Sequence, residues 1–133
     1  MRATGLLLAA LLLSGNAIAG QDQLQSFRDK TKEAWALCSW KANIAGTVFG
    51  DEAHFRETIS CVNELLSTAS AAYKSANQSA QQAVRPYYAK WIASMKSLPA
   101  LQASSKIEIE RSISDSSKAL EEAWALIELD HQQ

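Results

Sequence analysis

The chain has 133 residues, a formal net charge of −1, five glycines, two prolines and two cysteines. The near-neutral charge excludes the broad basic surface that attracts nucleic acids or anionic lipids, so we expect no nucleic-acid partner. The length suits one domain, and the scarcity of glycine and proline favours helix over sheet.

Residues 1–19 have the three parts of a secretory signal peptide. A basic start is followed by an apolar run at residues 6–13 (LLLAALLL) and by a small-x-small motif at residues 17–19 (AIA). We predict cleavage after Ala19, and a single helical domain over residues 20–133 that is periplasmic or secreted. The run is shorter than the roughly 20 apolar residues of a membrane span, and no cysteine lies near the cleavage site. We therefore expect neither a membrane span nor a lipid anchor.

The first helix of this domain is predicted over residues 22–45, with Gly46 as a left-handed stop. Apolar and small residues recur along it at helical spacing. The predicted core positions are Leu24, Phe27, Thr31, Ala34, Cys38 and Ala45.

The second helix is predicted to begin after Asp51, a good N-cap residue. Its apolar residues alternate at spacings of four and three, and this seven-residue repeat indicates near-parallel packing in a bundle. The predicted core positions are Phe55, Ile59, Val62, Leu66, Ala69, Tyr73 and Ala76.

The third helix is expected to begin near Ser79, with Gln82 completing a capping box. Pro86 leaves two alternatives, because proline is unfavourable inside a helix: the helix begins at Pro86, or it is kinked there. The predicted core positions are Val84, Tyr88, Trp91, Met95 and Leu98.

The fourth helix follows Pro99, and Ser105 with Glu108 forms a capping box at its start. Its predicted core positions are Ile109, Ile113, Ser116, Leu120, Ala123 and Ile127. The fold class predicted is all-α, a four-helix up-and-down bundle. A three-helix bundle, with the second and third helices merged through a kink, is the alternative.

The two cysteines are predicted to form a disulfide. Cys38 and Cys61 lie about equally far from the turn between the first two helices, so they are level in an antiparallel hairpin. Cysteine pairs in exported proteins are usually oxidised, and the absence of a C-x-x-C motif argues against a redox role. A bridge over a loop of this length contributes about 3 kcal/mol.

No constellation of residues predicts catalysis, a metal or a cofactor. Asp51, His54, Glu57 and Cys61 recur at helical spacing, but metal sites in bundles need inward ligands from several helices. A covalent haem needs C-x-x-C-H, which the chain lacks. The sequence contains no phosphate loop, nucleophile elbow or Ser/His/Asp set, so we expect the protein not to be an enzyme.

A second apolar stripe on the first helix predicts an interaction face. Leu37, Trp40 and Ile44 lie off the core stripe, and a one-sided surface helix should not carry two such stripes. The alternative is that this helix is sandwiched between neighbours. A short echo of the first helix in the fourth (EAWAL at residues 33–37 and 122–126) suggests that the face also includes Leu126 and Leu129.

A second candidate surface lies at the start of the third helix, where basic and aromatic residues alternate. We expect Tyr88 and Trp91 in the core, and Arg85 and Tyr87 on the surface as possible anchors for a partner.

Two functions from different classes follow from these features. The first is an exported, non-enzymatic protein-binding module, such as an inhibitor, an immunity protein or a chaperone-like protein, whose partner is another protein or a second copy. The alternative is a carrier of a small ligand or cofactor. Its aromatic pocket would be lined by Tyr73, Tyr88, Trp91 and Met95.

Overall fold

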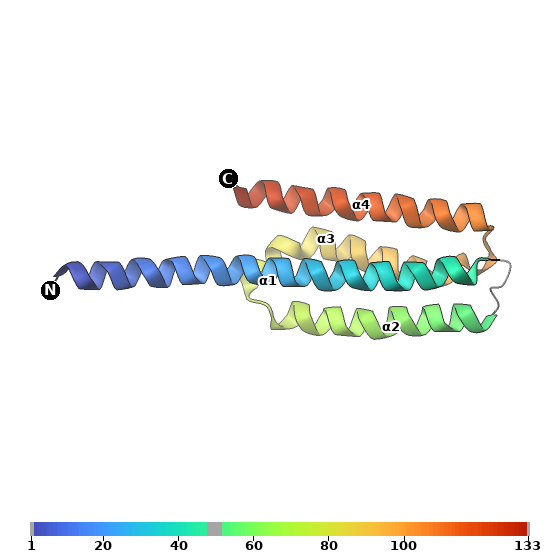
Figure 1. Ribbon diagram of the computed structural model, residues 1–133, viewed down its shortest axis with the longest axis horizontal. Helices are drawn as coiled ribbons and strands as arrows, with labels where there is room; N and C mark the ends of the chain where they lie inside the picture. Colours follow the sequence, from blue (N-terminus) through green and yellow to red (C-terminus); the bar gives the residue numbers. More distant parts are fainter. Residues whose placement is uncertain (1, 48–51, 133) are drawn as a thin grey trace.

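The computed structural model describes the backbone of residues 2–47 and 52–132, and the side chains of residues 20–47 and 52–131 (Figure 1). This part of the chain forms α1 (Arg2–Ala45), α2 (Glu52–Ser75), α3 (Gln78–Ser97) and α4 (Lys106–Gln132), with a short 3₁₀ helix, η1 (Pro99–Ala103), before α4. The predicted all-α four-helix bundle is confirmed. The helix α1 runs through the predicted cleavage site without a break. The predicted N-cap Asp51 lies outside the described residues.

The helices alternate in direction along the bundle (Figure 1). The helix α1 contacts each of the other three helices, and α3 also packs against both α2 and α4. The helices α2 and α4 therefore lie on opposite sides of the α1–α3 pair, so α1 and α3 must each bury a wider face than a one-sided surface helix.

Large side chains from α3 fill the centre of this core. Trp91, Tyr87 and Met95 are fully buried, and the Trp91 indole donates a hydrogen bond to the Thr31 carbonyl of α1 at 2.9 Å. A series of ring contacts joins α1, α2 and α3, through Phe27, Tyr73, Tyr88 and Trp91.

On α2 the predicted core stripe is displaced to one side. Ile59 is exposed, while Thr58 and Cys61 are buried in its place. Three core positions predicted from the seven-residue repeat are buried as expected, namely Phe55, Val62 and Ala69. Because the disulfide draws Cys61 toward α1, the buried face of α2 is rotated away from Ile59.

Gly46 follows the last residue of α1, but the prediction of a left-handed conformation there is wrong. No glycine among the described residues has a positive φ. Its backbone N–H continues the helical pattern by donating to the Ala42 carbonyl at 3.1 Å. A Cβ atom at this position would overlap Cδ1 of Ile109 on α4, so the close approach of that side chain, and not the backbone conformation, favours glycine here.

The start of α3 differs from the predicted capping box. Asn77 is the N-cap, and its side chain accepts a hydrogen bond from the Ala80 N–H at 2.8 Å. Pro86 lies inside the helix, which resolves the alternatives in favour of an early start. Both Pro86 and Gln82 are exposed, so water can solvate the Gln82 carbonyl that proline leaves without a helical donor.

The capping box of α4 is confirmed. The Glu108 N–H donates to the Ser105 hydroxyl at 3.3 Å, and the Ser105 N–H donates to the Glu108 carboxylate at 3.1 Å. These two bonds satisfy backbone donors that have no partner within the helix.

Candidate functional site

The predicted disulfide joins α1 to α2. Cys38 and Cys61 are bonded, with their Cα atoms 5.7 Å apart, and both residues are buried. The described part of the chain has no free cysteine. The bridge fixes the register of the two helices and therefore the shape of the surface between them.

Beside this bridge lies the α1 outer face, which we define as Leu37, Trp40 and Ile44. Trp40 is 59% exposed and Leu37 47%, whereas Ile44 is half-buried. Trp35, five residues before Trp40, is only 7% exposed and donates a hydrogen bond to Ser117 of α4 at 2.9 Å. The two tryptophans of α1 thus have different surroundings, and Trp40 is the one that solvent and a partner can reach.

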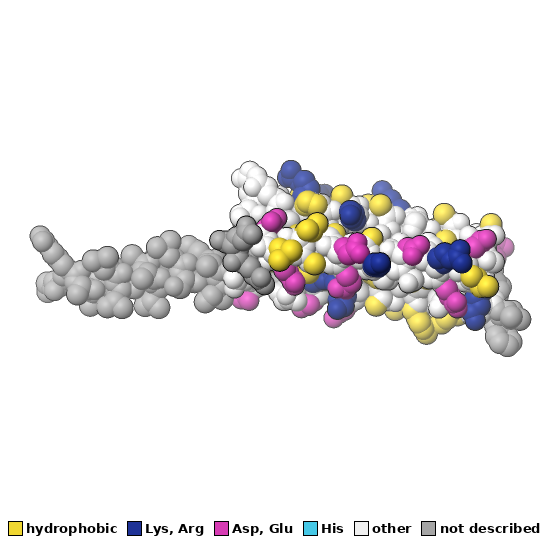
Figure 2. All heavy atoms as spheres, turned by 90° about the horizontal axis from the view of Figure 1, so that it is seen from above, with side chains coloured by type: hydrophobic (Ala, Val, Ile, Leu, Met, Phe, Trp, Pro, Cys, Tyr) yellow, Lys and Arg dark blue, Asp and Glu magenta, His cyan; other side chains and the backbone are white. Residues whose placement is uncertain are grey.

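The other two residues of the predicted face, Leu126 and Leu129, lie elsewhere. Both are exposed near the C-terminal end of α4, where Figure 2 shows hydrophobic side chains gathered. The contact between Arg28 and Glu121 sets the register of α1 against α4, and it places Leu126 roughly 25 Å along the bundle from Trp40 at 1.5 Å per residue. The structure therefore separates the five residues into two patches.

A surface groove between α1 and α2 continues the α1 outer face. This α1–α2 groove has a volume of about 260 Å³. Its apolar part consists of Leu37, Cys61 and Leu65, and its polar rim of Lys41, Ser60 and two carboxylates, Glu57 and Glu64.

The rim carboxylates have no basic partner among the described residues: no ion pair within 4.0 Å involves Glu57 or Glu64 there. Both side chains are exposed. The groove therefore combines an apolar floor with negative charge that nothing on the described surface pairs.

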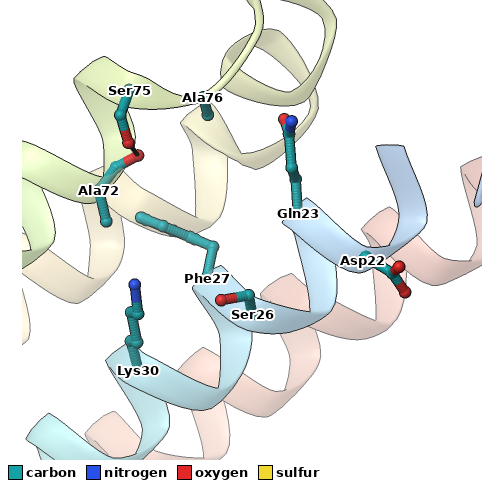
Figure 3. Close-up of a pocket in the computed structure, with 8 residues that line it drawn as sticks. All are labelled: Asp22, Gln23, Ser26, Phe27, Lys30, Ala72, Ser75 and Ala76. Carbon is teal, nitrogen blue, oxygen red and sulfur yellow. Dashed lines mark hydrogen bonds between the residues drawn. The ribbon is translucent and has the colours of Figure 1, made fainter. Parts of the chain in front are cut away.

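A larger pocket, of about 330 Å³, lies nearer the start of the bundle, also between α1 and α2 (Figure 3). The Phe27 ring points across it toward Ala72, and the Lys30 ammonium approaches the same opening from below. The Asp22 carboxylate points away from that opening. The Phe27 ring that lines this pocket is itself buried and contacts Tyr73 and Tyr88.

A buried polar cluster, which was not predicted from the sequence, is centred on Arg28. Its guanidinium lies 5.4 Å from the ring centroid of Tyr87 and 5.5 Å from that of Trp124. Nη1 donates to the Tyr87 hydroxyl at 3.1 Å, and Nη2 pairs with Glu121. The sequence does contain one indication that Arg28 is buried. It lies three residues before Thr31 and seven before Trp35, on the same face of the helix.

Thr31 completes this cluster. Its hydroxyl donates to the Phe27 carbonyl at 2.9 Å and lies 2.6 Å from the Tyr87 hydroxyl. Since the threonine proton is used on the carbonyl, the tyrosine donates to threonine and accepts from arginine. Among the described residues, no buried side-chain nitrogen or oxygen of this cluster lacks a hydrogen-bond partner, which indicates a structural role.

The prediction that Tyr87 lies on the surface is wrong. Tyr87 is fully buried because α3 packs against α4 as well as α1, and its ring contacts Trp124 edge-on at 5.1 Å. Arg85 is exposed as expected, and its Nε donates to the Tyr73 hydroxyl at 3.5 Å. The second candidate surface, at the start of α3, therefore includes Arg85 but not Tyr87.

The region expected to line a carrier pocket is occupied by its own side chains. Trp91 and Met95 are fully buried, and Tyr88 stacks on Tyr73 at 4.7 Å and on Trp91 at 6.0 Å. Burial raises the pKa of Tyr88 above 10.0; a hydrogen bond with Ser70 acts in the opposite direction, and the neighbouring Tyr73 adds to the rise.

The described residues, 2–47 and 52–132, offer neither a metal site nor a membrane span. No group of three or more His, Cys, Asp or Glu side chains there is arranged to hold a metal ion. None of the helices in that part of the chain has an apolar stretch long enough to cross a membrane.

The fold and the bridge define the protein as a disulfide-linked four-helix bundle. No protein-family model, curated protein or solved structure matches the chain.

Proposed function

We propose that the protein is an exported, non-enzymatic protein-binding module that uses the α1 outer face. The observation that carries this proposal is the exposure of Trp40, at 59%, on a helix whose other tryptophan is buried. Exposed tryptophan is rare on solvated surfaces, and it is enriched among the residues that dominate binding energy at protein interfaces.

Neighbouring features support the same interpretation. Leu37 and Ile44 extend the apolar stripe one turn on either side of Trp40, and the disulfide lies behind it. A surface held in one conformation loses less entropy when a partner binds, which favours affinity.

Export is the second part of the proposal. It rests on the signal-like pattern of residues 1–19, and an oxidised cysteine pair is typical of the periplasm and of secreted proteins. Inhibitors, immunity proteins and chaperone-like proteins are the functional classes that fit a small exported binder.

Substitution of Trp40 tests the proposed function, with Ile107 as a matched control. Ile107 is another exposed apolar residue, 67% exposed, on α4. We expect Trp40→Ala and Ile107→Ala each to change the free energy of unfolding by less than about 0.5 kcal/mol. Only Trp40→Ala should abolish chemical cross-linking to a partner, or self-association, in an extract of the native compartment.

Two outcomes would contradict the proposal. A large loss of stability in Trp40→Ala would make Trp40 a core residue, and unchanged cross-linking would move the interface elsewhere. Native mass spectrometry of the same preparation tests the alternative, since a small molecule retained by the protein would favour a carrier.

A further inference from the structure

The α1–α2 groove and the α1 outer face together form one continuous surface. Leu37 belongs to both, and Trp40 follows it by one helical turn on the exposed side of α1. Trp40 does not itself line the groove, so an occupant reaches Trp40 only if it extends past Leu37 over the outer side of α1.

The charge along this surface is predominantly negative. Glu57 and Glu64 lie seven residues apart on α2, so they occupy the same side of that helix two turns apart along the rim. On the same side of α1, Glu33 is exposed four residues before Leu37 and Lys30 is exposed seven residues before it, so these two charges offset each other. Lys41 is the one basic side chain that lines the groove.

This pattern favours a ligand that is apolar and basic at once. An aliphatic or aromatic side chain would cover Leu37, Leu65 and the disulfide, and a flanking Lys or Arg would pair with carboxylates that have no partner among the described residues.

The size of the surface argues for a short segment over a second copy of the chain. A stable interface takes about 20–30 residues from each partner, far more than the side chains that line the groove and the outer face.

We propose that the α1–α2 groove binds a short partner segment in which an apolar side chain is flanked by lysine or arginine. The proposal rests on the proposed function and specifies the chemistry of the partner.

Selection from a random 12-residue peptide phage library tests this proposal, with the oxidised full-length protein as target and its Trp40→Ala variant for counter-selection. We expect the enriched peptides to carry Lys or Arg within one helical turn of an aromatic or aliphatic residue. Against Glu57→Lys/Glu64→Lys, the flanking residues should change to Asp and Glu.

The affinity of one enriched peptide for the protein and for its variants gives a quantitative test of the same proposal. We expect Glu57→Gln/Glu64→Gln to weaken its binding roughly three- to tenfold, as loss of two exposed ion pairs should. The matched control is Glu108→Gln/Glu122→Gln, which neutralises two exposed carboxylates of α4 and should leave binding unchanged.

Enriched peptides without a basic bias, no enrichment, or a bias that persists in the Glu57→Lys/Glu64→Lys variant would each overturn the proposal. These results would leave the proposed function intact if Trp40→Ala still abolished cross-linking in the native extract. Loss of the cross-linking difference, with the peptide bias retained, would instead count against the proposed function alone.

Discussion

Arg28 pairs with Glu121 across the α1–α4 interface, with Nη2 and Oε1 2.5 Å apart, although one side chain is 7% exposed and the other 63%. The guanidinium lies against the rings of both Tyr87 and Trp124, which also contact each other, and its Nη2 donates to the carboxylate. The pair thus joins the aromatic interior of the bundle to its solvated surface.

This relationship predicts that Glu121 matters more for stability than its exposure suggests. Glu121→Ala leaves a buried guanidinium without its carboxylate, and we expect a loss of about 1–2 kcal/mol in the free energy of unfolding. The neighbouring Glu122→Ala, also exposed, should change it by less than about 0.5 kcal/mol. Urea denaturation of both variants would show equal effects if Arg28 were adequately solvated without Glu121.

The disulfide should contribute about 3 kcal/mol, because Cys38 and Cys61 close a loop with a sequence separation of 23. Reduction of the wild-type protein and the Cys38→Ser/Cys61→Ser variant should lower the urea midpoint to a similar extent. Reductant should have no effect on the serine variant. Two titratable thiols in the non-reduced protein would contradict the prediction.

Gly46 and Ile109 should be energetically coupled. Gly46→Ala places a methyl group against Cδ1 of Ile109, which is fully buried, and we expect a loss of about 1–3 kcal/mol from overpacking. Ile109→Val removes that same carbon atom and should cost about 0.5–1.5 kcal/mol by itself. The double variant should be more stable than the sum of the two losses predicts, as a double-mutant cycle would measure. Additive losses would argue against the contact.

The raised pKa of Tyr88 leads us to expect that the protein loses stability in alkaline solution. Burial raises its pKa in the folded protein above 10.0, so the folded state holds the phenolic proton more tightly than the unfolded state. The resulting stabilisation is present below about pH 10 and is lost as the pH rises through the folded-state pKa. Tyr88→Phe should therefore show a shallower decline of the unfolding free energy above about pH 10. Identical pH profiles for the two proteins would contradict this prediction.

The sequence predicts the helices well because their boundaries depend on local chemistry. The end of α1 at Ala45 and the capping box of Ser105 with Glu108 follow from residues within a few positions of each helix end. The predicted start of α3 was wrong by two residues, because Asn77 and not Ser79 is its N-cap. Asn77 and Ser79 lie two residues apart and are both good capping residues, so the sequence alone does not decide between them.

The candidate site was predicted only in part. The periodicity of α1 placed Trp40 opposite the core, and the structure leaves it exposed. The grouping of Trp40 with Leu126 and Leu129 was wrong because these residues lie at different levels along the antiparallel helices α1 and α4, as the Arg28–Glu121 contact shows. Helical periodicity gives the direction of a side chain around its helix, and not its level along a neighbouring helix.

The sequence by itself determined four amphipathic helices and the register of the first two, because helical periodicity and the length of the turn place Cys38 level with Cys61. Only the tertiary structure decided that Tyr87 is buried and that Arg28 lies in the interior. Both results follow from the contact of α1 with α3, which leaves α2 and α4 on opposite sides of the pair and makes each of its helices bury more than one face. A stripe in one helix shows which side is apolar, but the number of neighbours around that helix decides how wide its buried face must be.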